Sequence, residues 1–239
     1  MGKSKLEKLQ LEFNKQYPQL LEIAQNEIII PDPLFSTQNL LFLDEDRSCR
    51  IYLYGREEMP RFVLEWDECK IIEIRNEDYK RVGKIIEKWV FEKTIPSLLK
   101  KESPELAFCE LAYYYEKGEG IKGEFIKSWD EIEIYYREYP DSNRPFTGDA
   151  LKLIQEMRNE GLDEVLRAGQ SLWFFLISRE RRHGIANNRP YVQINFLGKN
   201  KMVVKIIEDY EEEYVVESEV KYKGVLEKII QELLKLKIK

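Results

Sequence analysis

The amino-acid sequence predicts an α+β fold, and three observations along the chain predict it. Short apolar or alternating runs, separated by turn residues, fill residues 27–75. The apolar spacing then becomes helical between residues 76 and 161, and strand-like runs return after residue 170 before a last helical segment. We therefore expect an N-terminal antiparallel meander, central helices, a second antiparallel β region and a C-terminal amphipathic helix.

The N-terminal part begins with the helical spacing of Leu6, Leu9 and Phe13. Five strand-like runs follow: "EIIIP", "LLFLD", "CRIYLY", "RFVLEW" and "KIIEIR". Turn-rich segments such as "DEDRS" and "GREEMP" separate them. Consecutive short strands joined by turns are typical of an antiparallel meander.

The central helices carry recognisable start and stop signals. In "NEDYKRVGKIIEKWVFE" we expect Asn76 to cap the helix, whose apolar face includes Val82 and Trp89. In "SPELAFCELAYYYEKG" we expect Ser103 to cap the next helix and Gly118 to end it. Further helices are expected at "FIKSWDEIEIYYREYP" and "TGDALKLIQEMRNEG".

The C-terminal part is expected to form strands at "SLWFFLIS", "YVQINFLG" and "MVVKIIED". The last segment, "GVLEKIIQELLKLKIK", has the apolar spacing of an amphipathic helix. We expect either two domains, residues 1–100 and 101–239, or one continuous domain. Whether the two β regions share one sheet stays open at this point.

Composition restricts the class of protein. The chain has 239 residues, of which 43% are hydrophobic and 34% charged, as in a folded globular protein. No apolar run approaches the ~20 residues that cross a bilayer, so we expect no membrane association. Its cysteines, Cys49, Cys69 and Cys109, are widely spaced, which favours free thiols and a cytoplasmic location.

The net charge of −6 argues against general attraction to nucleic acid or to anionic membranes. The charge is uneven, however. Glu208 to Glu219 reads "EDYEEEYVVESE", with seven acidic residues and no basic one. This run predicts a surface for a basic protein partner, and the candidate partner-binding residues are Tyr210, Glu211, Glu212, Glu213 and Tyr214.

No catalytic, metal or cofactor motif survives inspection. "GEGIKG" matches a dinucleotide-binding fingerprint, but a helical segment precedes it where a strand is required. "GQSLW" begins like a nucleophile elbow, yet Trp173 stands where the second glycine must be. A single histidine and scattered cysteines cannot form a zinc site. We predict no cofactor and no metal.

One stretch of opposite sign is the other candidate site. "SRERRHGIANNRPY" lies between two predicted strands and is therefore expected to be the loop of a hairpin, where binding groups often lie. Arginine side chains suit phosphate or carboxylate. The candidate anion-binding residues are Arg167, Gln170, Arg179, Arg181, Arg182, His183, Asn187, Asn188 and Arg189. The alternative is a solvated loop whose arginines pair with nearby acidic residues.

A resemblance rests on four patches: "DYKRVGKIIEKWV", "SPELAFCELAYYYEKGE", "FIKSW" and "LRAGQSLWFFLISR". Their hydrophobic and aromatic spacing, from about Asp78 to Arg179, resembles a bacterial family labelled natural product biosynthesis proteins. That label implies a genomic neighbourhood rather than a reaction. The resemblance therefore implies no catalytic residues.

Two functional classes follow from these features. The first is a cytosolic non-catalytic interaction protein, such as an immunity or accessory factor, that binds a basic partner through the acidic run. The second is an enzyme or ligand-binding protein that holds an anionic group with the Arg179–Arg189 loop, with His183 as the proton-transfer candidate. We favour the first, because the sequence shows no nucleophile, metal set or phosphate loop. Nucleic-acid binding ranks third, and the oligomeric state is open.

Overall fold

A computed structural model gives the protein as two compact units, Met1–Gly118 and Glu119–Lys239. It describes residues 5–16, 18, 38–53, 59–138, 147–182, 189–208, 211–217 and 219–238. Each unit has its own buried hydrophobic cluster. The sequence suggested a division after residue 100, whereas Leu106, Phe108 and Leu111 pack in the cluster of the first unit.

The first unit contains the expected antiparallel meander. Its strands are β1 (Gln38–Asp44), β2 (Arg47–Leu53), β3 (Arg61–Trp66) and β4 (Cys69–Arg75), in that order across the sheet. Tight turns at Glu45 and at Asp67–Glu68, all with positive φ, join neighbouring strands. The meander is confirmed for these strands, while the predicted strand "EIIIP" lies outside the described residues.

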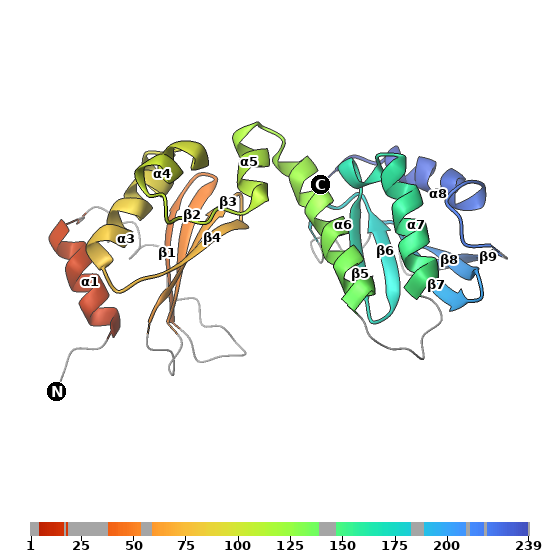
Figure 1. Cartoon of the computed structure of the whole chain (residues 1–239), viewed down its shortest axis with the longest axis horizontal. Coiled ribbons are helices and arrows are strands. Elements are labelled where there is room, and N and C mark those ends of the chain that lie inside the picture. Colours follow the sequence, from red (N-terminus) through yellow and green to blue (C-terminus); the bar gives the residue numbers. More distant parts are fainter. Residues whose placement is uncertain are drawn as a thin grey trace. The chain divides into compact units, whose positions relative to one another are not determined.

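Helices cover one face of this sheet (Figure 1). They are α1 (Lys5–Gln16), α3 (Tyr79–Ile86) and the π-helical turn η1 (Glu87–Phe91), followed by α4 (Pro96–Glu102) and α5 (Glu110–Glu116). Strand alternation places one set of apolar side chains on the covered face. This set packs against the helices and includes Phe42, Cys49, Ile51, Phe62, Leu64, Ile72 and Ile74.

The start of α3 differs from the prediction. Asp78, and not Asn76, caps the helix, because its Oδ1 accepts the backbone N–H of Arg81 at 3.1 Å. Asn76 instead accepts the N–H of Asp78 at 2.8 Å and so stabilises the turn before the helix.

The predicted helix from Ser103 also begins later. Ser103 ends α4, and α5 starts only at Glu110. The segment between them lies beside β4, where the N–H of Cys109 donates to the carbonyl of Ile71 at 3.2 Å. Burial of Leu106 and Phe108 at the sheet therefore outweighs local helix propensity. Gly118, with φ of 78°, follows α5 as predicted.

The charged side chain of Arg47 lies inside the first core. Arg47 is 2% exposed, and its guanidinium carbon lies 3.4 Å from the ring centre of Trp66 and 4.0 Å from that of Trp89. Burial lowers its pKa to about 10, against the opposing effect of Asp46 and Glu116. Arg47 thus stays cationic at neutral pH, and the two indole rings hold its charge.

The second unit contains a five-stranded antiparallel sheet. It begins with α6 (Gly120–Glu138), α7 (Thr147–Asn159) and the short 3-10 turn η2 (Leu162–Glu164). The strands β5 (Arg167–Ser171), β6 (Phe174–Ser178), β7 (Tyr191–Gly198), β8 (Lys201–Glu208) and β9 (Glu211–Glu217) lie in sequence order, before α8 (Val225–Leu234). The β regions thus form two separate sheets, and the predicted α+β class is confirmed.

The predicted strand "SLWFFLIS" is a strand only from Phe174, where β6 begins, and its first residues form the end of β5 and a turn. Leu172 and Trp173 connect β5 to β6, and Leu172 has φ of 55°. The hydroxyl of Tyr135 donates to the carbonyl of Leu172 at 2.9 Å, which fixes the turn against α6. The apolar run predicted one continuous buried strand, but Trp173 is 43% exposed and lies in a turn rather than in the core.

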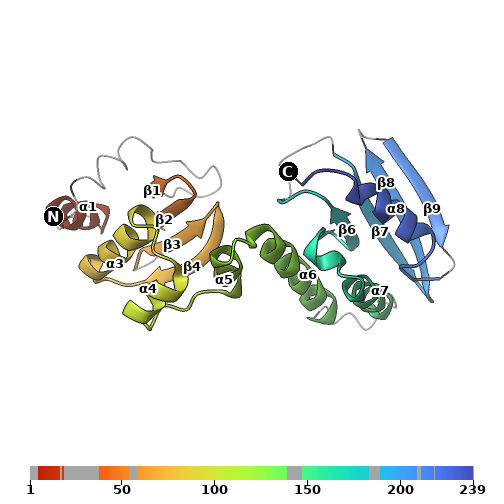
Figure 2. The same ribbon diagram turned by 90° about the horizontal axis from the view of Figure 1, so that it is seen from above.

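Helices α6, α7 and α8 pack on one face of the second sheet (Figure 2). Cross-strand register places Phe175, Ile194 and Val204 on that face. They contact helical residues such as Trp129 and Ile230 in a single cluster. Among the described helices, none is both long and apolar enough to span a bilayer.

Candidate functional site

The arginine-rich stretch joins β6 to β7, as the sequence predicted. Ser178 pairs with Tyr191 at the end of the hairpin, and residues 179–182 and 189–190 of the loop are described. The candidates His183, Asn187 and Asn188 lie outside the described residues.

The first part of the loop is tied to α6 by a buried ion pair. The Glu124 side chain is only 4% exposed, and its Oε1 accepts the Nε–H of Arg181 at 2.9 Å. Arg181 also donates from Nη2 to the same oxygen, while Nε of Arg182 lies 4.0 Å from Oε2. Arg167 donates from Nη1 to the carbonyl of Arg181 at 2.8 Å. These contacts fix the loop where it leaves β6.

Two further arginines fasten the chain that follows α8. Arg179 donates from Nε to the carbonyl of Leu236 at 3.1 Å and from Nη1 to that of Val165 at 2.7 Å. Arg189 donates from Nη1 to the carbonyl of Lys237 at 3.0 Å and to Glu180 at 2.7 Å. Burial lowers the pKa of Arg179 below its ordinary value. The loop thus holds residues 236–237, which follow α8.

The structure brings most described candidates of the loop together, but not Gln170. Arg167 pairs across the sheet with Ser178, beside the loop. Gln170 pairs with Phe175, toward the opposite end of the hairpin, and its side chain is exposed.

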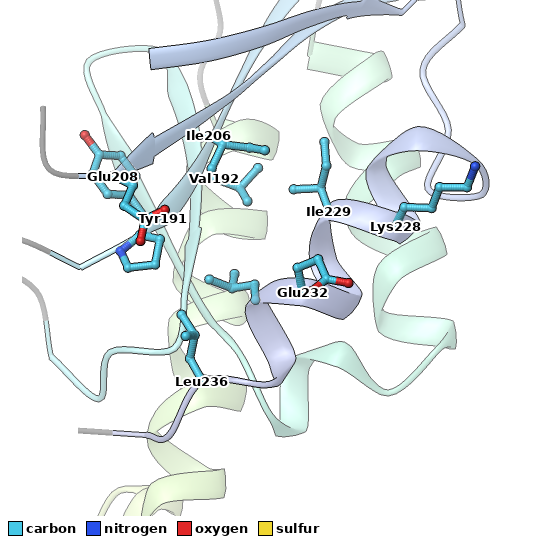
Figure 3. A pocket seen from close by; sticks show the side chains of 10 residues that line it. Tyr191, Val192, Ile206, Glu208, Lys228, Ile229, Glu232 and Leu236 are labelled. Atoms are coloured by element: carbon cyan, nitrogen blue, oxygen red, sulfur yellow. The ribbon is translucent and has the colours of Figure 1, made fainter. Parts of the chain in front are cut away.

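A groove of about 790 Å³ opens between α8 and the sheet (Figure 3). Its apolar lining comes from β7, β8 and α8, and charged side chains add to it. The lining residues are Pro190, Tyr191, Val192, Ile206, Glu208, Lys228, Ile229, Glu232, Leu233 and Leu236. Its size is typical of a binding pocket, for which ~300–1,000 Å³ is usual.

The groove follows from how α8 packs. Leu226, Ile230 and Leu233 recur at helical spacing and are buried against the sheet. Ile229 and Ile206 flank that stripe and remain partly exposed, so the space between them stays open. Because Arg179 and Arg189 hold residues 236–237, the arginine loop fixes the wall of the groove at the end of α8.

Strand β9 contains most of the acidic run and lies at one edge of the sheet. Its register with β8 places Glu213 opposite Ile206 and Glu211 opposite Glu208. Of these, Ile206 and Glu208 line the groove. Farther along β9, Val215 and Val216 are 39% and 61% exposed. The acidic strand and the groove are therefore neighbours. Tyr210 lies outside the described residues.

Sequence reasoning missed the strand, the groove and the buried partner of Arg181. Alternating β-prone residues at Tyr214 and Val216 are a strand signal that the acidic charge of the run obscured. The burial of Glu124 had a weak signal in the sequence, because this charged residue is near the apolar positions Phe125 and Trp129 of the same helix. The groove depends on tertiary packing and has no sequence signal.

The described residues contain no cluster of three or more histidine, cysteine or carboxylate side chains that could hold a metal ion. No protein-family model, curated protein or solved structure matches the chain.

Proposed function

We propose that the chain is a cytoplasmic, non-catalytic interaction protein, such as an immunity or accessory factor, that binds a basic protein partner. The binding face in this proposal is strand β9 together with the α8 groove. The observation that carries it is the position of the acidic run on an edge strand, directly beside an apolar groove with Glu208 in its lining.

Electrostatics supports a basic partner. The strand sequence contributes Glu211, Glu212 and Glu213, and Glu208 precedes them in the neighbouring strand. Acidic residues on one edge strand attract a cationic partner and speed its association at low salt. Apolar contacts in the groove would then slow dissociation, because buried apolar area stabilises the bound state.

The anion-binding alternative has weaker support from the geometry. Arg179, Arg181 and Arg189 donate to acceptors within the protein, and these contacts hold the fold of the second unit. An anion at the loop would have to compete with a buried carboxylate and with backbone carbonyls.

Affinity capture from the native host tests the proposal. Wild-type protein should retain a stoichiometric basic protein that elutes in salt, and Glu211, Glu212 and Glu213 changed together to lysine should abolish this retention. The matched control changes Glu77, Glu92 and Glu119, three exposed acidic residues outside the proposed face, to lysine. Equal capture by the β9 variant would contradict the proposal, as would capture of an anionic metabolite alone.

A further inference from the structure

We propose that β9 and the α8 groove bind an extended basic segment of the partner by strand addition, with one apolar side chain of that segment seated in the groove. This inference rests on the proposed function and specifies the mode of binding. It names a lysine- or arginine-rich segment that alternates with apolar residues.

The first argument is the backbone of β9. Antiparallel pairing with β8 uses one side of the strand, from Glu208↔Glu211 to Met202↔Glu217. Within the described part of the chain, no strand pairs with its other side. Such an edge presents a row of N–H and C=O groups that an extended peptide can complete.

The second argument is charge. Acidic residues on an edge strand discourage pairing between two copies of the same edge, because the like charges repel. The same residues favour a strand of opposite charge, since cross-strand pairs of opposite sign stabilise a sheet. Glu208 and Glu217 add an acidic residue at each of the two ends of the β8–β9 pairing.

The third argument is the groove, which places apolar surface next to that edge. Val192, Ile206 and Ile229 form an apolar lining, and Glu208 lies at the end of the groove where β9 begins. A segment paired outside β9 lies two strand spacings, about 10 Å, from β8, and one or two residues beyond Glu211 together with a large side chain span that distance to the groove. A phenylalanine or leucine at that point would bury its side chain there.

A synthetic peptide tests this mode of binding. The probe is a fluorescein-labelled peptide, GFVKVKVFG, whose lysines and phenylalanines share one face of a strand, as Glu211, Glu213 and the groove do, with an anchor residue at each end so that either strand direction is served. One control peptide has N-methyl groups on alternate amides and keeps the charge, while the other replaces both phenylalanines with alanine. By fluorescence anisotropy we expect each control to bind about tenfold more weakly than the probe.

Two variants locate the anchor. Ile229→Trp fills the groove and should weaken the probe to the affinity of the alanine peptide, while leaving the alanine peptide unchanged. Ile134→Trp, at an exposed position of α6, is the matched control and should leave both peptides unchanged. If Ile229→Trp lowers the thermal midpoint, Ile229→Ala replaces it, and it should weaken the probe while leaving the alanine peptide unchanged.

The outcomes distinguish a wrong binding mode from a wrong binding face. If both control peptides bind as tightly as the probe, but lysine at positions 211–213 removes binding, strand addition is wrong and the acidic face still binds basic segments. If lysine at these positions leaves probe binding unchanged, or if no peptide binds, both the binding mode and the proposed face are wrong.

Discussion

Arginine has two different structural uses in this protein. Arg47 lies between two indole rings in the first core, and Arg181 pairs with the buried Glu124 in the second unit. Both side chains depend on the planar, delocalised guanidinium, which stacks and forms forked hydrogen bonds where lysine cannot. For the arginines of the β6–β7 loop the sequence left open an anion site or pairing with acidic residues of the protein, and the described contacts, such as Arg181–Glu124 and Arg189–Glu180, are with the protein itself.

The Arg181–Glu124 pair leads to a stability prediction. Arg181→Ala leaves a buried carboxylate without its main partner, so we expect the free energy of unfolding to fall by about 3 kcal/mol. Urea denaturation measures this change. Arg137→Ala, which removes an exposed pair with Glu133 on α6, is the control and should cost under about 0.5 kcal/mol. Equal effects of the two substitutions would contradict the structural role of Arg181.

Glu73 leads to a prediction about pH. Hydrogen bonds from Arg61, then from Lys70 and Arg75, hold its pKa well below the usual range. Because the folded-state pKa is lower than the unfolded value of about 4.3, the carboxylate stabilises the fold above that pH and loses this effect as the pH falls below it. The wild type should therefore lose stability between about pH 5 and pH 2 more steeply than Glu73→Gln. Parallel stability curves for the two proteins would refute this.

At the scale of elements, the sequence predicted most strands and helices where a single period dominated. The run "YVQINFLG" coincides with β7, because every second side chain enters the core. Predictions failed where tertiary contacts overrode local signals, as in the extended segment 106–109 beside β4. They also failed at Leu172, whose apolar side chain gave no sign of a turn.

The β5–β6 turn supplies a prediction at this scale. Leu172 has φ of 55°, which costs a residue with a Cβ about 1–2 kcal/mol, and its side chain is 67% exposed. Leu172→Gly should therefore raise the free energy of unfolding by about 0.5–1 kcal/mol, since glycine adopts this conformation without strain. Val216→Gly, at an exposed strand position paired with Val203, should instead lower it. Chemical denaturation of both variants checks the contrast, and a destabilised Leu172→Gly variant would oppose it.

At the scale of the whole molecule, the described cores do not cross the division between the units. The first cluster runs from Leu9 to Tyr115 and the second from Trp129 to Leu233. The sequence showed an α+β order, but it could not show that the two β regions form separate sheets. That outcome depends on strand pairing at long range, for which local periodicity carries no signal.

Separate cores predict separate folding. Residues 1–118 and 119–239, expressed as individual chains, should each unfold cooperatively, because each retains its own buried cluster. Circular dichroism with thermal denaturation measures this. A unit that lacks a transition on its own would mean that its stability requires the other.

The binding face belongs to the second unit, and hydrogen exchange tests it most directly. The protein is labelled in deuterated buffer with and without the peptide GFVKVKVFG, and protection is mapped along the chain. The account predicts new protection at the amides of residues 211–217, and slower exchange in residues 228–236 that border the groove. Protection confined to residues 179–190, with exchange in β9 unchanged, would contradict the account. That result would indicate that the arginine loop is the binding site.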